Sequence, residues 1–264
     1  MKKTKVIAIA NQKGGVGKTT TCFNLGAALA LEHAKNVLLV DLDPQANLSD
    51  YLGYGSDDGL PTMTHLITEV ATRNTINSDA VKHAIRKHNK IEHLSYMPAD
   101  INLANAETAM SMTLSRETIL KRILTAEVIS EYDYVIIDCL PSLGILLINA
   151  LTAANELIIP VQTQKFSMDG LTALTSLVEQ IRATINSNLN KTLILPTMAD
   201  NTVVSKSALR ALSESYAADL SSVVVHKSVE AAKSSETGKA PCRTKSKLGE
   251  EYIKLAAEFE RGVF

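Results

Sequence analysis

Continuous apolar runs alternate with longer helical patterns along almost the whole chain. The apolar runs predict strands at residues 6–10, 36–41, 93–97, 134–138, 156–161, 192–197 and 222–225. The helical patterns fall at residues 18–33, 115–130, 143–154, 168–187, 205–219 and 249–261. Several apolar runs consist of consecutive Val, Ile and Leu, which is typical of parallel strands covered on both faces. The pattern therefore predicts a doubly wound α/β fold, a mostly parallel sheet with helices on both faces and a ligand site at the carboxyl ends of its strands.

A glycine-rich turn lies between the first predicted strand and the first predicted helix. Residues 11–20 read Asn-Gln-Lys-Gly-Gly-Val-Gly-Lys-Thr-Thr. Glycines let backbone N–H groups face an anion, and the helix N-terminus adds partial positive charge, so the turn predicts a phosphate-binding loop (P-loop). In this pattern Lys18 contacts phosphate and Thr19 contacts Mg²⁺. The predicted nucleotide-binding residues are Lys13, Gly14, Gly15, Val16, Gly17, Lys18, Thr19 and Thr20.

The loop departs from the usual P-loop at its start. Gln12 stands where the usual pattern has glycine, and Lys13 adds a second lysine. Lys13 lies too far from Lys18 in the loop to repeat its role. Such a long cation could reach the γ-phosphate held by a neighbouring subunit, as an arginine finger does in trans. The alternative is an ordinary solvated loop lysine.

Two more predicted strands end in carboxylates. Asp41 and Asp43 follow one buried strand, and Asp138 ends another. We predict that Asp43 orients the attacking water, with a turn acid or a helix N-cap as the alternative. Asp138 is predicted to hold Mg²⁺ through water. The loop after it, residues 139–144, would then be the switch that senses the γ-phosphate.

Composition narrows the class of protein. A chain of 264 residues can form one well-buried α/β domain, so we expect a single domain over residues 1–264. The three cysteines form no CxxC pair, which fits a reducing compartment. No stretch approaches the roughly 18 apolar residues of a membrane span, so a soluble protein is expected.

The net charge of −1 provides no global attraction for nucleic acid, so any such contact must be local. Residues 226–247 carry six positive side chains and two negative ones, a local balance of 6 − 2 = +4. This cluster predicts non-specific DNA contact, and the alternative is a solvated basic face. The candidate DNA-binding residues are Lys206, Arg210, Lys227, Lys245 and Lys247. A second basic run, residues 82–90, is expected to end a surface helix with solvent-facing histidines.

The P-loop at residues 13–20, the acidic stretch at 41–45 and the stretch 134–144 together resemble the deviant Walker A ATPases of the ParA/Soj partition group, a class of P-loop NTPases. Further similar stretches cover nearly the whole chain, at residues 158–162, 169–171, 196–198, 227–229, 238–239 and 246–255.

The resemblance implies a cycle driven by ATP and Mg²⁺. ATP joins two subunits in a sandwich homodimer in which Lys13 of each reaches the nucleotide of the other. The dimer binds DNA without sequence preference, and a ParB-type centromere-binding partner stimulates slow hydrolysis, which releases it and positions a plasmid or chromosome. Lys13, Lys18 and Asp43 are then the catalytic residues, Thr19 and Asp138 the metal site, and Thr197 and Met198 lie near the adenine. A cytoplasmic, nucleoid-associated protein is implied.

Departures from the family pattern qualify this expectation. Leu140 replaces a proline of the switch loop, Glu230 stands at a position that is usually basic, and Thr202 stands where some relatives have arginine. No N-terminal helix-turn-helix domain is expected. A MinD-like membrane-cycling ATPase is the main alternative, but residues 250–261 carry many acids for a membrane-binding helix. A metabolic enzyme and a scaffold that binds ATP without hydrolysing it are further alternatives.

Overall fold

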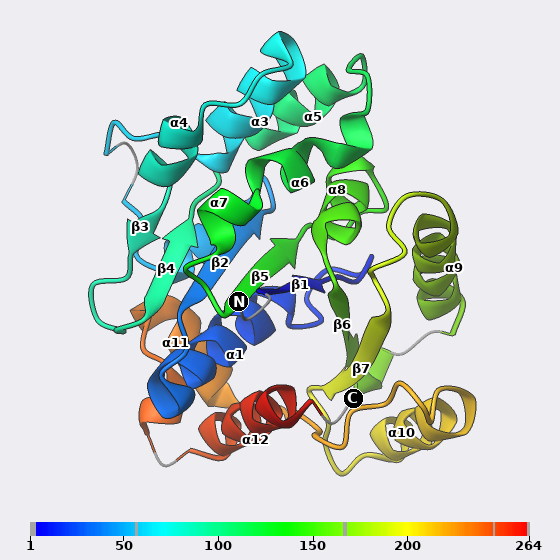
Figure 1. The fold of residues 1–264 in the computed structure, drawn as a ribbon. Coiled ribbons are helices and arrows are strands. Elements are labelled where there is room, and N and C mark those ends of the chain that lie inside the picture. The colour runs from blue at the N-terminus through cyan, green and yellow to red at the C-terminus, as the bar shows by residue number, and fades with distance from the viewer. Residues whose placement is uncertain (1–3, 56–57, 166–167, 245, 263–264) are drawn as a thin grey trace.

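The computed structural model describes residues 4–55, 58–165, 168–244 and 246–262. These residues form one seven-stranded sheet in the order β3-β4-β2-β5-β1-β6-β7 (Figure 1). The strands are β1 (Lys5–Ile9), β2 (Val37–Leu42), β3 (Arg86–Lys87), β4 (Leu94–Met97), β5 (Tyr134–Cys139), β6 (Glu156–Gln162) and β7 (Lys191–Thr197). Every neighbouring pair is parallel except β3 with β4, which confirms the predicted doubly wound fold.

Helices cover both faces of the sheet (Figure 1). The α-helices of the described residues are α1 (Lys18–His33), α2 (Asn47–Tyr51), α3 (Met63–Arg73), α4 (Ser78–His83), α5 (Leu103–Met110), α6 (Ile119–Ile123), α7 (Ala126–Ile129), α8 (Ile145–Ala153), α9 (Met168–Thr184), α10 (Val203–Ser215), α11 (Val229–Thr237) and α12 (Lys247–Arg261). Three short 3₁₀ turns accompany them, η1 (Arg116–Thr118), η2 (Thr163–Lys165) and η3 (Pro241–Arg243).

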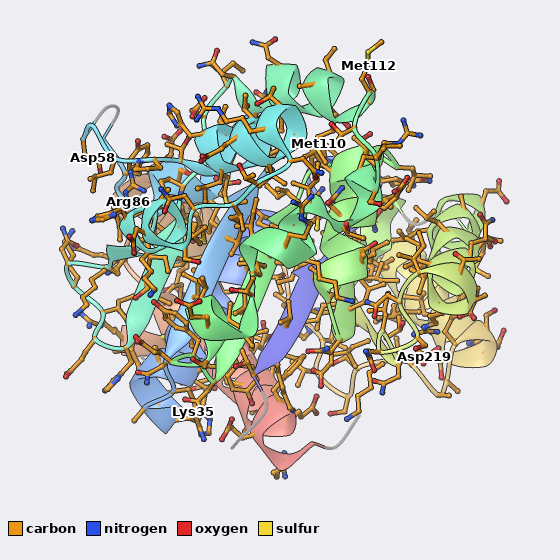
Figure 2. The ribbon with its side chains drawn as sticks, turned by 45° about the horizontal axis from the view of Figure 1, so that its top comes forward. Lys35, Asp58, Arg86, Met110, Met112 and Asp219 are labelled. Atoms are coloured by element: carbon orange, nitrogen blue, oxygen red, sulfur yellow. The ribbon has the colours of Figure 1, made fainter. Side chains whose placement is uncertain are left out.

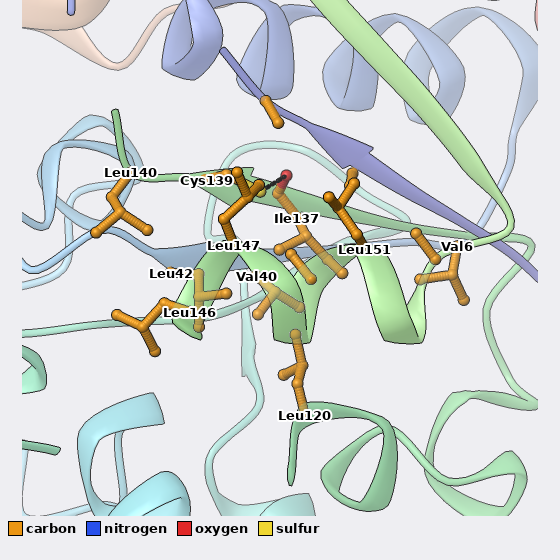
Figure 3. Close-up of a cluster of buried hydrophobic side chains, with 14 of the residues drawn as sticks. Val6, Val40, Leu42, Leu120, Ile137, Cys139, Leu140, Leu146, Leu147 and Leu151 are labelled. Atoms are coloured by element: carbon orange, nitrogen blue, oxygen red, sulfur yellow. Dashed lines mark hydrogen bonds between the residues drawn. The ribbon is translucent and has the colours of Figure 1, made fainter. Parts of the chain in front are cut away.

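The alternation of side chains along each strand divides the interior into two apolar clusters. Ile137 of β5 points to the face covered by α3, α5, α6, α8 and α9, where it packs beside Leu147 and Leu151 (Figure 3). Its neighbour Ile136 points to the opposite face, which α1 and α12 cover. Strands buried on both sides need apolar residues at every position, which is why they read as continuous apolar runs.

The predicted helix over residues 115–130 is broken into three pieces, η1, α6 and α7. Thr125 adopts an extended backbone between the last two pieces. The turn allows Ile119, Leu120 and Val128 all to reach the apolar cluster. The sequence pattern predicted helical structure over this range but not the bend within it.

The predicted strand at residues 222–225 is not a full strand. Flanking bridges join Leu220 to Ile194 and His226 to Ala199, so this segment follows the outer edge of β7. Pro196 lies between those bridges and has no N–H to donate to the segment, although its carbonyl accepts a hydrogen bond from the Val225 N–H at 2.9 Å. The Val223 N–H donates to the Ser221 hydroxyl and not to β7.

The basic run at residues 82–90 differs from the expectation. Arg86 is 9% exposed and forms a forked ion pair with Asp58, with Nε–Oδ2 and Nη2–Oδ1 distances of 3.0 and 2.8 Å (Figure 2). His88 is 8% exposed, and its Nδ1 accepts hydrogen bonds from the N–H groups of Lys90 and Ile91. The expectation of solvent-facing histidines was therefore wrong for His88, whose role is to close a turn.

Candidate nucleotide-binding site

The P-loop connects the carboxyl end of β1 to α1, and long-range hydrogen bonds hold it in place. Gly15 and Gly17 have φ angles of 71° and 91°, in the left-handed region that favours glycine. The Thr197 hydroxyl donates to the Val16 carbonyl at 2.8 Å, and the Asn11 amide donates to the Pro160 carbonyl at 2.8 Å. The ends of β6 and β7 thus fix the loop before any ligand binds.

A cavity of about 550 Å³ opens above this loop. The predicted site residues that line it are Gly14, Gly15, Gly17, Lys18, Thr19, Thr20, Asp43 and Met198. Lys18 Nζ donates to the Lys13 carbonyl at 3.0 Å. Burial lowers the pKa of Lys18, and Asp138 partly offsets this shift. A buried cation beside backbone N–H groups at a helix N-terminus forms a site for a polyphosphate.

The two carboxylates after β2 have different surroundings. Asp41 is buried and accepts hydrogen bonds from the N–H groups of Asp43 and Ser49 and from the Ser49 hydroxyl. Burial raises the pKa of Asp41 to about 6, although these hydrogen bonds oppose the shift. Asp43 lines the cavity, and its Oδ1 accepts from the Gln45 N–H at 2.9 Å. Asp41 therefore stabilises the loop, while Asp43 is placed to act on a ligand.

Asp138 at the end of β5 is a buried carboxylate without a hydrogen-bond partner on either oxygen among the described residues. Burial and the nearby Asp41 raise the pKa of Asp138, and the Thr19 hydroxyl and Lys18 oppose the shift. Carboxylate and hydroxyl oxygens are ligands that suit Mg²⁺, which usually keeps several waters. The donor set of Thr19 and Asp138 therefore fits a hydrated Mg²⁺ beside the P-loop.

Lys13 lies outside this cavity wall. Its backbone N–H donates to Asn11 Oδ1 at 2.9 Å, and its side chain is half-buried. A Cβ atom at Gly170, near the start of α9, would lie 3.8 Å from Lys13 Cε. In this single chain the lysine therefore packs against α9 and does not point into the cavity of its own subunit.

The candidate DNA-binding residues lie on the C-terminal elements. Lys206 and Arg210 are exposed on α10, and Lys227 is exposed in the segment that runs beside β7. Lys247 Nζ of α12 lies 4.0 Å from Glu251 Oε1, and Glu251 also accepts hydrogen bonds from His226, the residue before Lys227. Among the described residues, no hydrogen bond or ion pair joins Lys206 or Arg210 to Lys227 or Lys247. Lys245 lies outside the described residues.

Helix α11 contributes a wall of the cavity that the sequence pattern did not predict. Ser235 and Glu236 of this helix line the same cavity as the P-loop. Residues 229–237 have little apolar periodicity, because only Ser234 of this helix is fully buried. The Ser228 N-cap and the C-terminal Gly238, which has a φ of 62°, were the available signals for the helix.

Comparisons with known proteins agree with this geometry. The family model described as "AAA domain" matches residues 4–191. The chain is 46% identical to the sporulation initiation inhibitor protein Soj of Bacillus subtilis over 196 residues, 74% of this chain and 73% of that protein. It is 34% identical to the chromosome partitioning protein ParA of Caulobacter vibrioides over 96% of this chain and 93% of that protein.

Among solved structures, the chain is similar to cobyrinic acid a,c-diamide synthase from Mycobacterium smegmatis with bound ATP analog and magnesium. The TM-score is 0.81 at 32% identity, with 99% of this chain and 96% of that chain covered. The relatives agree with what the P-loop and the acidic strand ends indicate. This chain belongs to the ParA/Soj family of partition ATPases.

Proposed function

We propose that the protein is a partition ATPase that binds ATP and Mg²⁺ in the cavity above the P-loop and hydrolyses ATP slowly to ADP and phosphate. The buried Asp138 beside Lys18 carries this proposal. Its carboxylate has no hydrogen-bond partner among the described residues and is free to hold a hydrated cation, and the P-loop offers donors to an anion. Partition relatives of 34% and 46% identity support it.

Each polar residue has a role in the proposed reaction. Lys18 binds the phosphates, and Asp43 orients the attacking water. Thr19 would hold Mg²⁺ directly and Asp138 through water. When bound, the ion would neutralise charge on the phosphate oxygens. Met198 packs near the adenine, and Thr197 supports that end of the site by fixing Val16.

The proposed cycle depends on a homodimer. ATP joins two copies face to face, so that Lys13 leaves its position against α9 and reaches the γ-phosphate bound to the other subunit. A lysine supplied in trans would stabilise charge in the transition state, as arginine fingers do. Loss of the γ-phosphate then separates the subunits.

The dimer binds DNA without sequence preference through Lys206, Arg210, Lys227, Lys245 and Lys247, and a ParB-type partner stimulates hydrolysis. This would place the protein in the cytoplasm on the nucleoid. Two subunits double the number of cations, and each neutralised phosphate releases counterions, so affinity would fall steeply with salt.

The membrane-cycling alternative finds less support. No helix of the described segments combines the length and apolarity needed to cross a bilayer. A surface-bound helix would need a free apolar face, but the apolar residues Leu248, Tyr252, Leu255 and Phe259 of α12 are buried against the body of the protein.

Mass in solution tests the proposal, measured with ADP and with ATP. The Asp43→Ala variant keeps ATP intact during the measurement. Doubling of the mass with ATP and Mg²⁺ alone is expected. The same mass with either nucleotide in the Asp43→Ala variant would contradict the dimer switch, while absence of nucleotide binding would contradict the ATPase.

A further inference from the structure

One wall of the nucleotide cavity comes from α11, which packs against α2. Tyr51 is buried and its hydroxyl donates to Ser234 Oγ at 2.5 Å, while the Ser234 hydroxyl donates to the Lys239 carbonyl at 2.7 Å. A Cβ atom at Gly238 would lie 3.0 Å from the Tyr51 carbonyl oxygen. This close approach brings the last turn of α11 to the edge of the cavity.

The lining of the cavity carries charges of both signs. Lys18 and the N-terminus of α1 make the P-loop positive. Asp50 and Glu236 line the same cavity and are acidic. A triphosphate is attracted by Lys18 and repelled by the two carboxylates, so the carboxylates suit the uncharged part of the ligand.

The Glu236 carboxylate is available for a ligand. It is exposed, and no hydrogen bond or ion pair engages it among the residues that the structure describes. An ionised carboxylate only accepts hydrogen bonds. A nucleoside offers matching donors, the ribose hydroxyls and, on adenine, the exocyclic amine. Met198, which lines the same cavity beside Gly17, offers an adaptable apolar surface of the kind that suits an aromatic base.

On the basis of the proposed ATPase function, we propose that Glu236 determines nucleotide specificity by accepting a hydrogen bond from a donor group of the nucleoside. A nucleoside bound between Met198 and Glu236 would also be in direct contact with α11. Because α11 begins two residues after Lys227, the bound nucleotide would contact the helix next to a candidate DNA-binding residue.

The test measures dissociation constants for ADP and three analogues, 2′-deoxy-ADP, 3′-deoxy-ADP and purine riboside diphosphate, which lacks the amine. Diphosphates avoid hydrolysis during the measurement. The proteins are the wild type, Glu236→Ala, Glu236→Gln, which keeps an acceptor, and the matched control Glu230→Ala. Glu230 lies on the same helix but does not line the cavity.

We expect Glu236→Ala to weaken ADP binding about tenfold, as for one lost hydrogen bond to a charged group. The wild type should bind one analogue about tenfold more weakly than ADP, Glu236→Ala should lose that discrimination, and Glu236→Gln should retain part of it. The analogue affected identifies a ribose hydroxyl or the amine as the donor. Equal discrimination in wild type and Glu236→Ala, or none in the wild type, would overturn the role of Glu236 alone. A wild type that binds no ADP would overturn the ATPase as well.

Discussion

Asp41 and Asp138 are direct partners in the ladder between β2 and β5, yet their surroundings are opposite. Asp41 accepts hydrogen bonds from three donors on Asp43 and Ser49, whereas Asp138 has no hydrogen-bond partner in the described chain. One carboxylate stabilises the loop, and the other is left for a cation.

This contrast predicts opposite effects of two matched substitutions on stability without Mg²⁺. Asp138→Asn replaces a buried carboxylate that costs free energy either as an unpaired charge or as a group held protonated, so the free energy of unfolding in EDTA should rise by about 1–3 kcal/mol. Asp41→Asn leaves buried donors poorly paired and should lower it by about 1–3 kcal/mol. Denaturant unfolding in EDTA measures both. A loss of stability in Asp138→Asn would show that its carboxylate has an internal structural role.

Asp43→Ala should retain ATP binding and slow hydrolysis. If Asp43 orients the attacking water, its loss should reduce the single-turnover rate about 10²–10⁴-fold with little change in the ATP dissociation constant. Asp50→Ala serves as the control because Asp50 lines the same cavity and has no assigned part in the hydrolysis step. Equal rates in wild type and Asp43→Ala would remove Asp43 from the mechanism.

Substitution of the two P-loop lysines should affect different steps, nucleotide binding for Lys18 and dimerisation for Lys13. Lys18→Ala should abolish detectable nucleotide binding, since Lys18 is the buried cation of the cavity. Lys13→Ala should still bind ATP as a single subunit and should not double in mass. Calorimetry measures nucleotide binding and light scattering measures the mass, and the two methods applied to the same samples distinguish these variants. A Lys13→Ala protein that forms ATP-dependent dimers with wild-type hydrolysis would show that Lys13 does not act in trans.

Charge reversal on the C-terminal elements should weaken DNA binding. Lys227→Glu and Lys247→Glu are each expected to reduce affinity about tenfold or more at low salt and to lower the salt slope by about 1 per lost phosphate contact. Lys121→Glu on α6 makes the same charge change at an exposed position elsewhere. Gel shifts with ATP measure all three. If the Lys121 variant loses as much affinity as the others, net charge and not this surface accounts for binding.

Acid should destabilise the protein through His88. Burial, aided by Lys90 and Arg243, lowers the pKa of His88, and its Nδ1 must stay unprotonated to accept two N–H groups. Below pH about 6.5 the unfolded chain binds a proton that the folded chain does not, so stability falls as pH falls through that value. His88→Asn keeps an acceptor that does not titrate.

The Tm of wild type and His88→Asn should therefore diverge between pH 7.5 and 5, with the wild type falling faster. Parallel Tm curves over this range would show that protonation of His88 does not contribute.

The parts of the site that the sequence predicted are those set by local backbone chemistry. The turn containing Gly15 and Gly17 and the strand ends at Asp41 and Asp138 follow from short-range rules, and the parallel sheet brings them together. Burial of Arg86 and His88 could not be predicted, because a basic run reads as solvated unless its distant partner Asp58 is known. The wall formed by Glu236 was missed for a similar reason, since Tyr51 and Ser234 that hold it are far apart in the chain.

The irregular pairing beside Pro196 also affects how the molecule behaves in a crowded solution. A β7 with a complete outer neighbour would extend the sheet by another regular strand, whose free edge could pair with other chains. The segment from Leu220 to His226 lies beside β7 and is joined to it by two isolated bridges instead of a regular ladder, and β3 at the opposite edge of the sheet has only two residues. Both edges of the sheet are thus poor templates for strand pairing with other chains. Association of this protein with other molecules would then depend on other parts of its surface.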